Sequence, residues 1–310
     1  MKPAKRNTII TILMTLCLSG LCTTDLLYGG KPTEDVMLYL RLPRVLTAVL
    51  ATGALAVAGS QMQSIFRNPL ADPYIMGVSS GAALGAAIVT MAGIQSGLSL
   101  SLAAISGAAI SSAVILAVAS KVHSANTLLT FGILLGFFSA AVVTMLQYAS
   151  PAEKLKLYYA WSAGSYSAAG YPDIVIMAIA LAAGLVLGIG GAKGLDLILF
   201  GDEFTTLAGA SPRKIRLSAI LSSCLIAGSV TAFCGPIGFV GIVAPQIVRE
   251  IFKTSTHRIV VPLSFLIGAF IGVFADLISQ IFRLPVSATM ALFGIPVIVV
   301  MLLRPSPGRK

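Results

Sequence analysis

Residues able to do chemistry are sparse in this sequence and form no recognisable catalytic constellation. There is no G-x-x-x-x-G-K-[ST] phosphate-binding loop, and no nucleophile has a base at a suitable spacing. The two histidines, His123 and His257, lie in polar loops far apart in the sequence. The four cysteines lie within or at the ends of apolar runs, without the spacing of metal ligands. We therefore expect no catalytic residues, no metal site and no cofactor.

One ionisable residue, Asp276, lies well inside an apolar run, near its predicted outer end. An ionisable group at membrane depth is a functional candidate by default. One hypothesis is that Asp276 couples transport to an ion gradient, as in a secondary transporter. The other is a structural role, in which Asp276 pairs with Arg283 or caps backbone groups. We favour the structural role and keep the secondary transporter as the alternative.

The composition places the chain in a membrane. Of its 310 residues, 57% are hydrophobic and only 10% are charged, whereas a soluble protein carries about 25% charged residues. The formal net charge of +10 would suit nucleic acid. However, the basic residues lie between apolar runs and are not clustered with aromatic residues. Membrane lipid is therefore an expected partner and nucleic acid is not.

Apolar runs predict an all-α integral membrane protein with about ten transmembrane helices. About twenty apolar residues cross the hydrocarbon core as one helix. The first run resembles a secretory signal, but no small-x-small cleavage site follows it, so we expect an uncleaved span. The eighth run is short for a full crossing. The predicted spans are 8–27, 45–65, 74–91, 98–119, 127–148, 174–192, 215–233, 238–252, 259–282 and 285–303.

The basic residues of the loops predict the orientation. With the N-terminus in the cytoplasm, 15 Lys and Arg residues fall on the cytoplasmic side and six on the outer side. Cytoplasmic loops carry the excess of basic residues. We therefore expect a multi-pass protein of the inner (plasma) membrane with both termini in the cytoplasm.

A stiff polar turn interrupts the chain after the second span. Residues 67–73 read Arg-Asn-Pro-Leu-Ala-Asp-Pro, and the next apolar run opens on Gly77 and Gly81. The two prolines cannot continue a helix, and they favour extended conformations at Asn68 and Asp72. The stretch therefore predicts a helical hairpin.

These residues also carry a family resemblance. The matching features are Arg41-Leu42-Pro43-Arg44, Gly53, Gly59, Gln63, Asn68-Pro69-Leu70-Ala71-x-Pro73, Gly77-x-x-x-Gly81-Ala82, the GPIGFVG run at 235–241, Pro245, Arg249 and Ala291-Leu292-Phe293-Gly294-x-Pro296. In these the chain resembles the FecCD/BtuC-type permease subunits of ABC importers. The resemblance implies one transmembrane permease domain over 1–310, folded as a type II importer bundle. It also implies that ATP is hydrolysed on a separate subunit, so the chain is not an enzyme.

The loop 201–213 carries strong helix-boundary signals. Asp202 is a natural N-cap and Gly209 a natural stop, while Ser211 caps again ahead of Pro212. We expect two short helices with an apolar ridge that includes Phe204 and Leu207. The ridge would either rest on lipid headgroups or, as the resemblance implies, dock into an ATP-binding subunit. The coupling residues implied within about 202–214 are Asp202, Phe204, Leu207, Gly209, Ser211, Pro212 and Arg213.

The resemblance implies two further sites. Arg41 and Arg44, and less securely Arg283, would receive acidic residues of a substrate-binding protein at the outer face, because guanidinium groups engage carboxylates bidentately. A cytoplasmic gate would be formed by Asn68, Leu70, Ser124 and Asn126, although ordinary turn chemistry fits these residues equally well. Gln246 stands where the family commonly has His, and no role is assigned to it.

Together these features predict an ATP-driven importer that works by alternating access. The cargo would be an iron chelate (ferric siderophore or haem) or cobalamin, with iron favoured only because iron systems are the commoner use of such permeases. The implied partners are a second copy of the chain, two ATP-binding subunits and a periplasmic or lipid-anchored substrate-binding protein.

Overall fold

The computed structural model of the chain describes residues 3–30, 32–94, 97–122, 124–189 and 192–303. Within them the chain forms helices and connecting turns, without a strand. A π-helical turn, Met37–Arg41, precedes α3, and a 3₁₀ turn, Pro73–Met76, precedes α4. The helices are α1 Pro3–Leu27, α2 Glu34–Val36, α3 Leu42–Ile65, α4 Val78–Ala92, α5 Gly97–Ala119, α6 Ala125–Tyr148, α7 Ala152–Ser162, α8 Tyr171–Ile189, α9 Ala192–Ile198, α10 Asp202–Leu207, α11 Pro212–Cys234, α12 Val240–Phe252, α13 His257–Phe282 and α14 Val286–Leu303.

Each of the ten predicted spans corresponds to a helix, which confirms the all-α membrane fold. In the described part of the chain, seven helices are long and apolar enough to cross a membrane, while α4 and α14 are shorter apolar helices. Helix α12 has 13 residues and is short, as expected. The span predicted over 174–192 ends earlier, at Ile189, and Ala192 already belongs to α9. Gly190 and Gly191 lie outside the described residues.

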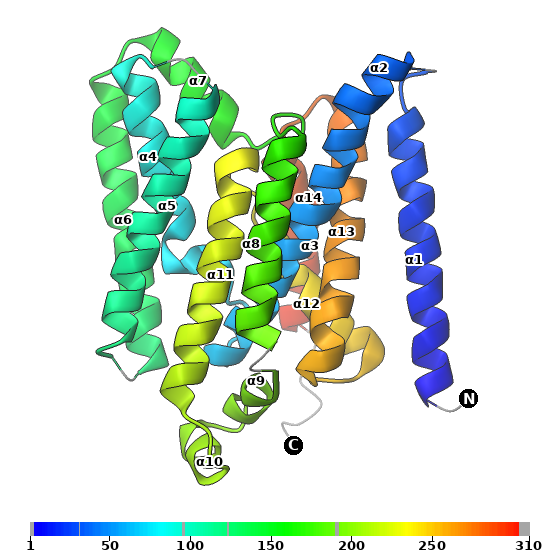
Figure 1. Ribbon diagram of the computed structural model, residues 1–310, viewed down its shortest axis with the longest axis vertical. Helices are drawn as coiled ribbons and strands as arrows, with labels where there is room; N and C mark the ends of the chain where they lie inside the picture. Colours follow the sequence, from blue (N-terminus) through cyan, green and yellow to red (C-terminus); the bar gives the residue numbers. More distant parts are fainter. Residues whose placement is uncertain (1–2, 31, 95–96, 123, 190–191, 304–310) are drawn as a thin grey trace.

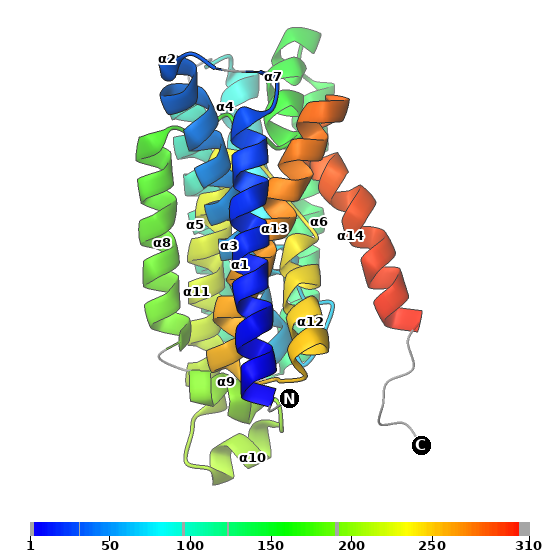
Figure 2. The same ribbon diagram turned by 90° about the vertical axis from the view of Figure 1, so that its right-hand side faces the viewer.

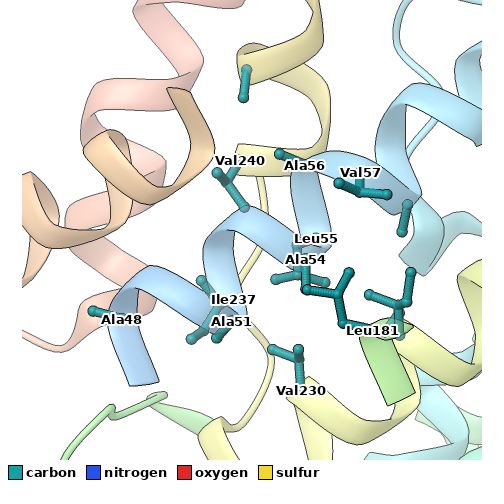
Figure 3. Close-up of a cluster of buried hydrophobic side chains, with 14 of the residues drawn as sticks. Ala48, Ala51, Ala54, Leu55, Ala56, Val57, Leu181, Val230, Ile237 and Val240 are labelled. Atoms are coloured by element: carbon teal, nitrogen blue, oxygen red, sulfur yellow. The ribbon is translucent and has the colours of Figure 1, made fainter. Parts of the chain in front are cut away.

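Helix α3 is the central element of the bundle. Most of its residues are buried, and it packs against α8, α11, α12 and α13. Its buried face is built from small residues, so neighbouring helices approach closely. Figure 3 shows Ala51, Ala54 and Leu55 of α3 near Leu181 of α8 and Val230 of α11. Helix α3 therefore joins the helices on its different sides into one bundle.

Glycines set the closest helix contacts. A Cβ added at Gly59 of α3 would lie 2.0 Å from the carbonyl oxygen of Gly241 in α12, and one at Gly272 of α13 would lie 2.1 Å from Thr52 Oγ1. No side chain fits at such distances. In lipid, where apolar burial between helices gains little, backbone packing of this kind holds helices together.

The short helices mark the two ends of the bundle. Helices α2 and α7 lie at one end, here called the α7 end, and α9 and α10 at the other, the α10 end (Figure 1). Helix α1 begins near the α10 end, and α14 runs towards that end from the α7 end (Figure 2). Helix α7 was not predicted, because charged residues interrupt its apolar pattern at Glu153, Lys154 and Lys156.

Candidate functional site

The predicted coupling segment projects from the α10 end (Figures 1 and 2). Glycines shape its turns: Gly201 has φ +105° before α10, and Gly209 has φ +79° after it. The predicted stop at Gly209 is confirmed. The predicted N-cap at Asp202 is wrong, because Gly201 holds that position and Asp202 is the first helical residue. The Asp202 carboxylate instead accepts hydrogen bonds of 2.7 and 2.8 Å from Arg216.

The second short helix predicted in this segment is also wrong. Ser211 does cap a helix, accepting a hydrogen bond of 3.4 Å from the Lys214 N–H, with Pro212 at the first helical position. That helix is the long α11, which continues from there to Cys234. The two short helices are instead α9 and α10. Sequence analysis missed α9 because it merged Ala192 into the preceding span.

An exposed apolar ridge lies on the outer side of α10. Leu207 is 88% exposed and Phe204 is 49% exposed. Phe200, which sequence analysis did not single out, is 73% exposed, and its ring centroid lies 5.2 Å from that of Phe204. Thr205 of the same helix is fully buried, and its hydroxyl donates a hydrogen bond of 2.7 Å to the Gly201 carbonyl oxygen. We call Phe200, Phe204 and Leu207 the α10 ridge.

Arg213 and Ser124 line the same cavity beside the coupling segment. The cavity has a volume of about 260 Å³ and is also lined by Asp202, Thr206 and Leu128. The Arg213 guanidinium donates to the carbonyl oxygen of Ser120, at the end of α5. The start of α11 is therefore attached to the α5–α6 turn, which holds the predicted gate residue Ser124.

The two predicted gate turns rest on different helices. In the first, here called the gate turn (residues 67–71), Asn68 Oδ1 accepts a hydrogen bond of 2.9 Å from the Leu70 N–H, and Gln246 Nε2 of α12 donates to the Pro69 carbonyl oxygen at 3.1 Å. In the second, Ser124 caps α6 by accepting from the Thr127 N–H at 3.4 Å, and Asn126 lies in the first turn of that helix.

The predicted docking arginines gather at the α7 end, and two of them already hold partners within the chain. Arg41 Nη1 donates to the carbonyl oxygens of Leu26 at 2.7 Å and Gly30 at 3.2 Å. Arg44 forms a bidentate ion pair with Asp276, both bonds being 2.8 Å long. Arg283 ends α13 with φ +54° and is exposed.

The predicted pairing of Asp276 with Arg283 is therefore wrong. Helices α3 and α13 pack along their lengths and bring Arg44 to the buried Asp276, whereas Arg283 lies beyond the end of α13. Gln280 extends the cluster, because its Nε2 donates to Asp276 Oδ2 at 3.2 Å and to Asp25 of α1. The sequence offered no signal for this cluster, since Arg44 and Asp276 are 232 residues apart.

His257 was also misplaced by sequence analysis. It is the first residue of α13 and is fully buried between Asp196 and Ser64. Among the described residues, no group of three His, Cys, Asp or Glu side chains could hold a metal ion. His123 lies outside the described residues.

Comparison with known proteins places the chain in a family. The model of the FecCD transport family matches residues 8–304. The chain is 34% identical to the hemin transport system permease protein HmuU of Yersinia pestis, over 90% of this chain and 87% of that protein. It is 31% identical to the Fe(3+) dicitrate transport system permease protein FecD of Escherichia coli, over 95% and 98%. It is also 31% identical to the vitamin B12 import system permease protein BtuC of Vibrio parahaemolyticus, over 89% and 85%.

A solved structure has the same fold. An inward-facing metal-chelate type ABC transporter superposes with a TM-score of 0.88 at 27% identity, covering 95% of this chain and 99% of the other.

Proposed function

The chain belongs to the FecCD transport family of ABC transporter permeases, and on that premise we propose that it imports an iron chelate (ferric siderophore or haem) or cobalamin across the inner membrane. It works as a homodimer by alternating access, with both termini in the cytoplasm. ATP is hydrolysed by two separate ATP-binding subunits, and a periplasmic or lipid-anchored binding protein delivers the cargo.

The observation that carries this proposal is the α10 ridge. Two large apolar side chains of α10, Phe204 and Leu207, are exposed, and so is Phe200 in the turn that precedes this helix. Helix α10 packs on α9 and α11, and the ion pair between Asp202 and Arg216 joins it to α11. Clustered apolar side chains that remain exposed on a fixed backbone are typical of a docking surface. The ridge thus supports docking of an ATP-binding subunit, with Asp202, Gly209, Ser211, Pro212 and Arg213 setting its shape.

The binding protein docks at the α7 end. Arg283 is exposed and available for an acidic partner. Arg41 and Arg44 are partly exposed, and each already forms hydrogen bonds within the chain. A carboxylate of the binding protein would compete with these intramolecular acceptors for the guanidinium groups. Residues Asn68, Leu70, Ser124 and Asn126 line the cytoplasmic gate of the dimer.

The cargo assignment rests on the relatives. Their names include hemin, ferric dicitrate and vitamin B12. All three are large metal-containing complexes, and the similar solved structure is described as metal-chelate type. These names support the proposal of a metal-chelate cargo, and iron chelates are favoured over cobalamin because iron systems are the commoner use of such permeases.

The ion pair of Asp276 argues against the alternative, a secondary transporter driven by an ion gradient. A proton carrier must bind and release its proton in each cycle. Protonation of Asp276 would leave the Arg44 guanidinium without the carboxylate that holds it by two hydrogen bonds.

Co-purification tests the proposal. The chain, expressed with its cognate ATP-binding subunit, should retain that subunit through detergent purification. The double variant Phe204→Glu, Leu207→Glu should lose the subunit, because two charges would be buried in the contact. Tyr148→Glu is the matched control, since Tyr148 is 96% exposed at the other end of the bundle. Retention of the subunit by the ridge variant, or transport by the purified chain without a nucleotide-hydrolysing partner, would refute the proposal.

A further inference from the structure

A chain of hydrogen bonds connects α9 to the end of α3. Asp196 of α9 accepts two hydrogen bonds at Oδ1, one of 2.9 Å from the His257 backbone N–H and one of 2.6 Å from His257 Nδ1. On its other side, His257 Nε2 lies 2.5 Å from Ser64 Oγ. His257 and Ser64 are fully buried, and the Asp196 side chain is 32% exposed. Asp196 is thus the most exposed member of this series of hydrogen bonds, and it lies on α9, the helix that precedes α10 in the sequence.

Gln63, the residue of α3 that precedes Ser64, continues the connection to α12. Gln63 Nε2 donates to the carbonyl oxygens of Gly241 and Ile242, each at 3.1 Å. Gln63 Oε1 accepts from Gln246 Nε2 at 3.0 Å and from Arg249. Both polar ends of the Gln63 amide are therefore occupied, which fixes its position against α12.

The gate turn is attached to the same residues. The Arg67 N–H donates to the Ser64 carbonyl oxygen at 3.2 Å, and the Asn68 N–H donates to the Gln63 carbonyl oxygen at 3.1 Å. Gln246 donates a second bond to the Pro69 carbonyl oxygen. The gate turn is therefore held on one side by the backbone of α3 and on the other by a side chain of α12.

We propose that Asp196, His257, Ser64, Gln63 and Gln246 form a relay that transmits movement of the α10 segment to the gate turn. The relay rests on the proposed function, which supplies both the docking role of α10 and the gating role of residues 68–70. Each member is a positioning residue and contacts no cargo. The relay also gives a role to Gln246, which holds the gate turn to α12.

The elements that carry the relay are closely packed at both of its ends. Phe200 follows Asp196 by four residues, just after the end of α9, and its ring packs on Phe204 of α10. Phe200 therefore links the α10 ridge to α9. At the far end, the backbones of Gly59 and Gly241 are in contact, so α3 and α12 move together. Buried, close-packed elements of this kind shift as units and do not deform continuously.

Hydrogen–deuterium exchange of the detergent-solubilised chain tests the relay without any partner. In Asp196→Ala, the amides of the gate turn should exchange at least about fivefold faster, because the variant loses both His257 bonds and the loss of a single buried hydrogen bond already changes a local opening equilibrium by about that factor. Gln246→Leu should have the same effect from the other end. Asp196→Asn should behave like the wild type, since its amide oxygen still accepts both His257 bonds.

A matched control separates the relay from general loosening. Ser264 lies on α13, as His257 does, is fully buried, and its hydroxyl has no hydrogen-bond partner. Ser264→Ala should therefore leave exchange of the gate turn unchanged. Equal exchange in Asp196→Ala and the wild type, or an equal rise in Ser264→Ala, would overturn the proposal.

A second measurement tests whether nucleotide binding to the ATP-binding subunit changes the gate turn through the relay. The variant Leu70→Cys is made in a chain whose four native cysteines are replaced, and its thiol is labelled with a maleimide in complex with the ATP-binding subunit. Adding a non-hydrolysable ATP analogue should change the labelling rate in the Asp196→Asn background, and this change should vanish in Asp196→Ala. An unaltered nucleotide response in Asp196→Ala would refute the relay. Failure of the subunit to bind any variant would instead refute the proposed function, and the exchange result would still stand.

Discussion

The ion pair between Arg44 and Asp276 gives a quantitative prediction about the α7 end of the bundle. Asp276 is fully buried and the Arg44 side chain is 25% exposed, with two bonds of 2.8 Å between them. Asp276→Ala would leave the guanidinium poorly solvated and without its counter-ion. Removing one partner of a buried pair costs about 3–5 kcal/mol. Because the partly exposed Arg44 side chain keeps some contact with solvent, we expect a loss of unfolding free energy at the lower end of this range, about 3 kcal/mol.

Thermal unfolding of the detergent-solubilised chain measures this cost. For a chain of this length, 1 kcal/mol corresponds to about 2 °C in Tm, so Asp276→Ala should lower Tm by about 6 °C. The double variant Arg44→Met, Asp276→Leu should lose clearly less, because it removes the charge and the acceptor together. Asp35→Ala, which removes an exposed carboxylate on α2, is the control and should leave Tm unchanged. A Tm for Asp276→Ala within about 1 °C of the wild type would show that the pair is not an energetic link between α3 and α13.

Three further predictions concern local packing and capping. Gly59→Ala should abolish recovery of monodisperse protein in size-exclusion chromatography, because the added Cβ would lie 2.0 Å from the Gly241 carbonyl oxygen. The control Gly238→Ala should be recovered normally, because no atom lies within 4 Å of the added Cβ. Arg41→Ala should make the α1–α2 connection at least several-fold more sensitive to protease, because the two bonds to Leu26 and Gly30 are lost; unchanged cleavage would contradict this. Ser211→Ala should destabilise the chain by about 0.5 kcal/mol, the low end for an N-cap, because its bond to Lys214 is 3.4 Å long; a Tm drop of several degrees would mean that Ser211 does more than cap α11.

Sequence analysis located the spans well because their signals are local. Hydropathy and length define each span, and proline or glycine defines its ends. The break after α3, the stop at Gly209 and the cap at Ser211 all depend on interactions within a few residues of the chain. The errors at α10 were small shifts of the same kind, such as Gly201 in place of Asp202 as N-cap.

The polar contacts inside the bundle could not be predicted in the same way. Arg44 with Asp276, and Ser64 with His257, join residues 232 and 193 positions apart. Each pairing depends on which faces of α3 and α13 pack together and on the offset of the two helices along their axes. Small residues of α13, Gly268 and Gly272, set this offset by packing directly on Thr52 and Ala56 of α3, but their spacing alone does not say which helix they contact.

By itself, then, the sequence determined that the chain is a helical membrane protein and where its apolar spans lie. Only the tertiary structure decided the partners of the buried polar side chains and which short helices project at the α10 end. The physical reason is range: helix formation and capping act over about four residues, whereas helix packing depends on surfaces assembled from the whole chain.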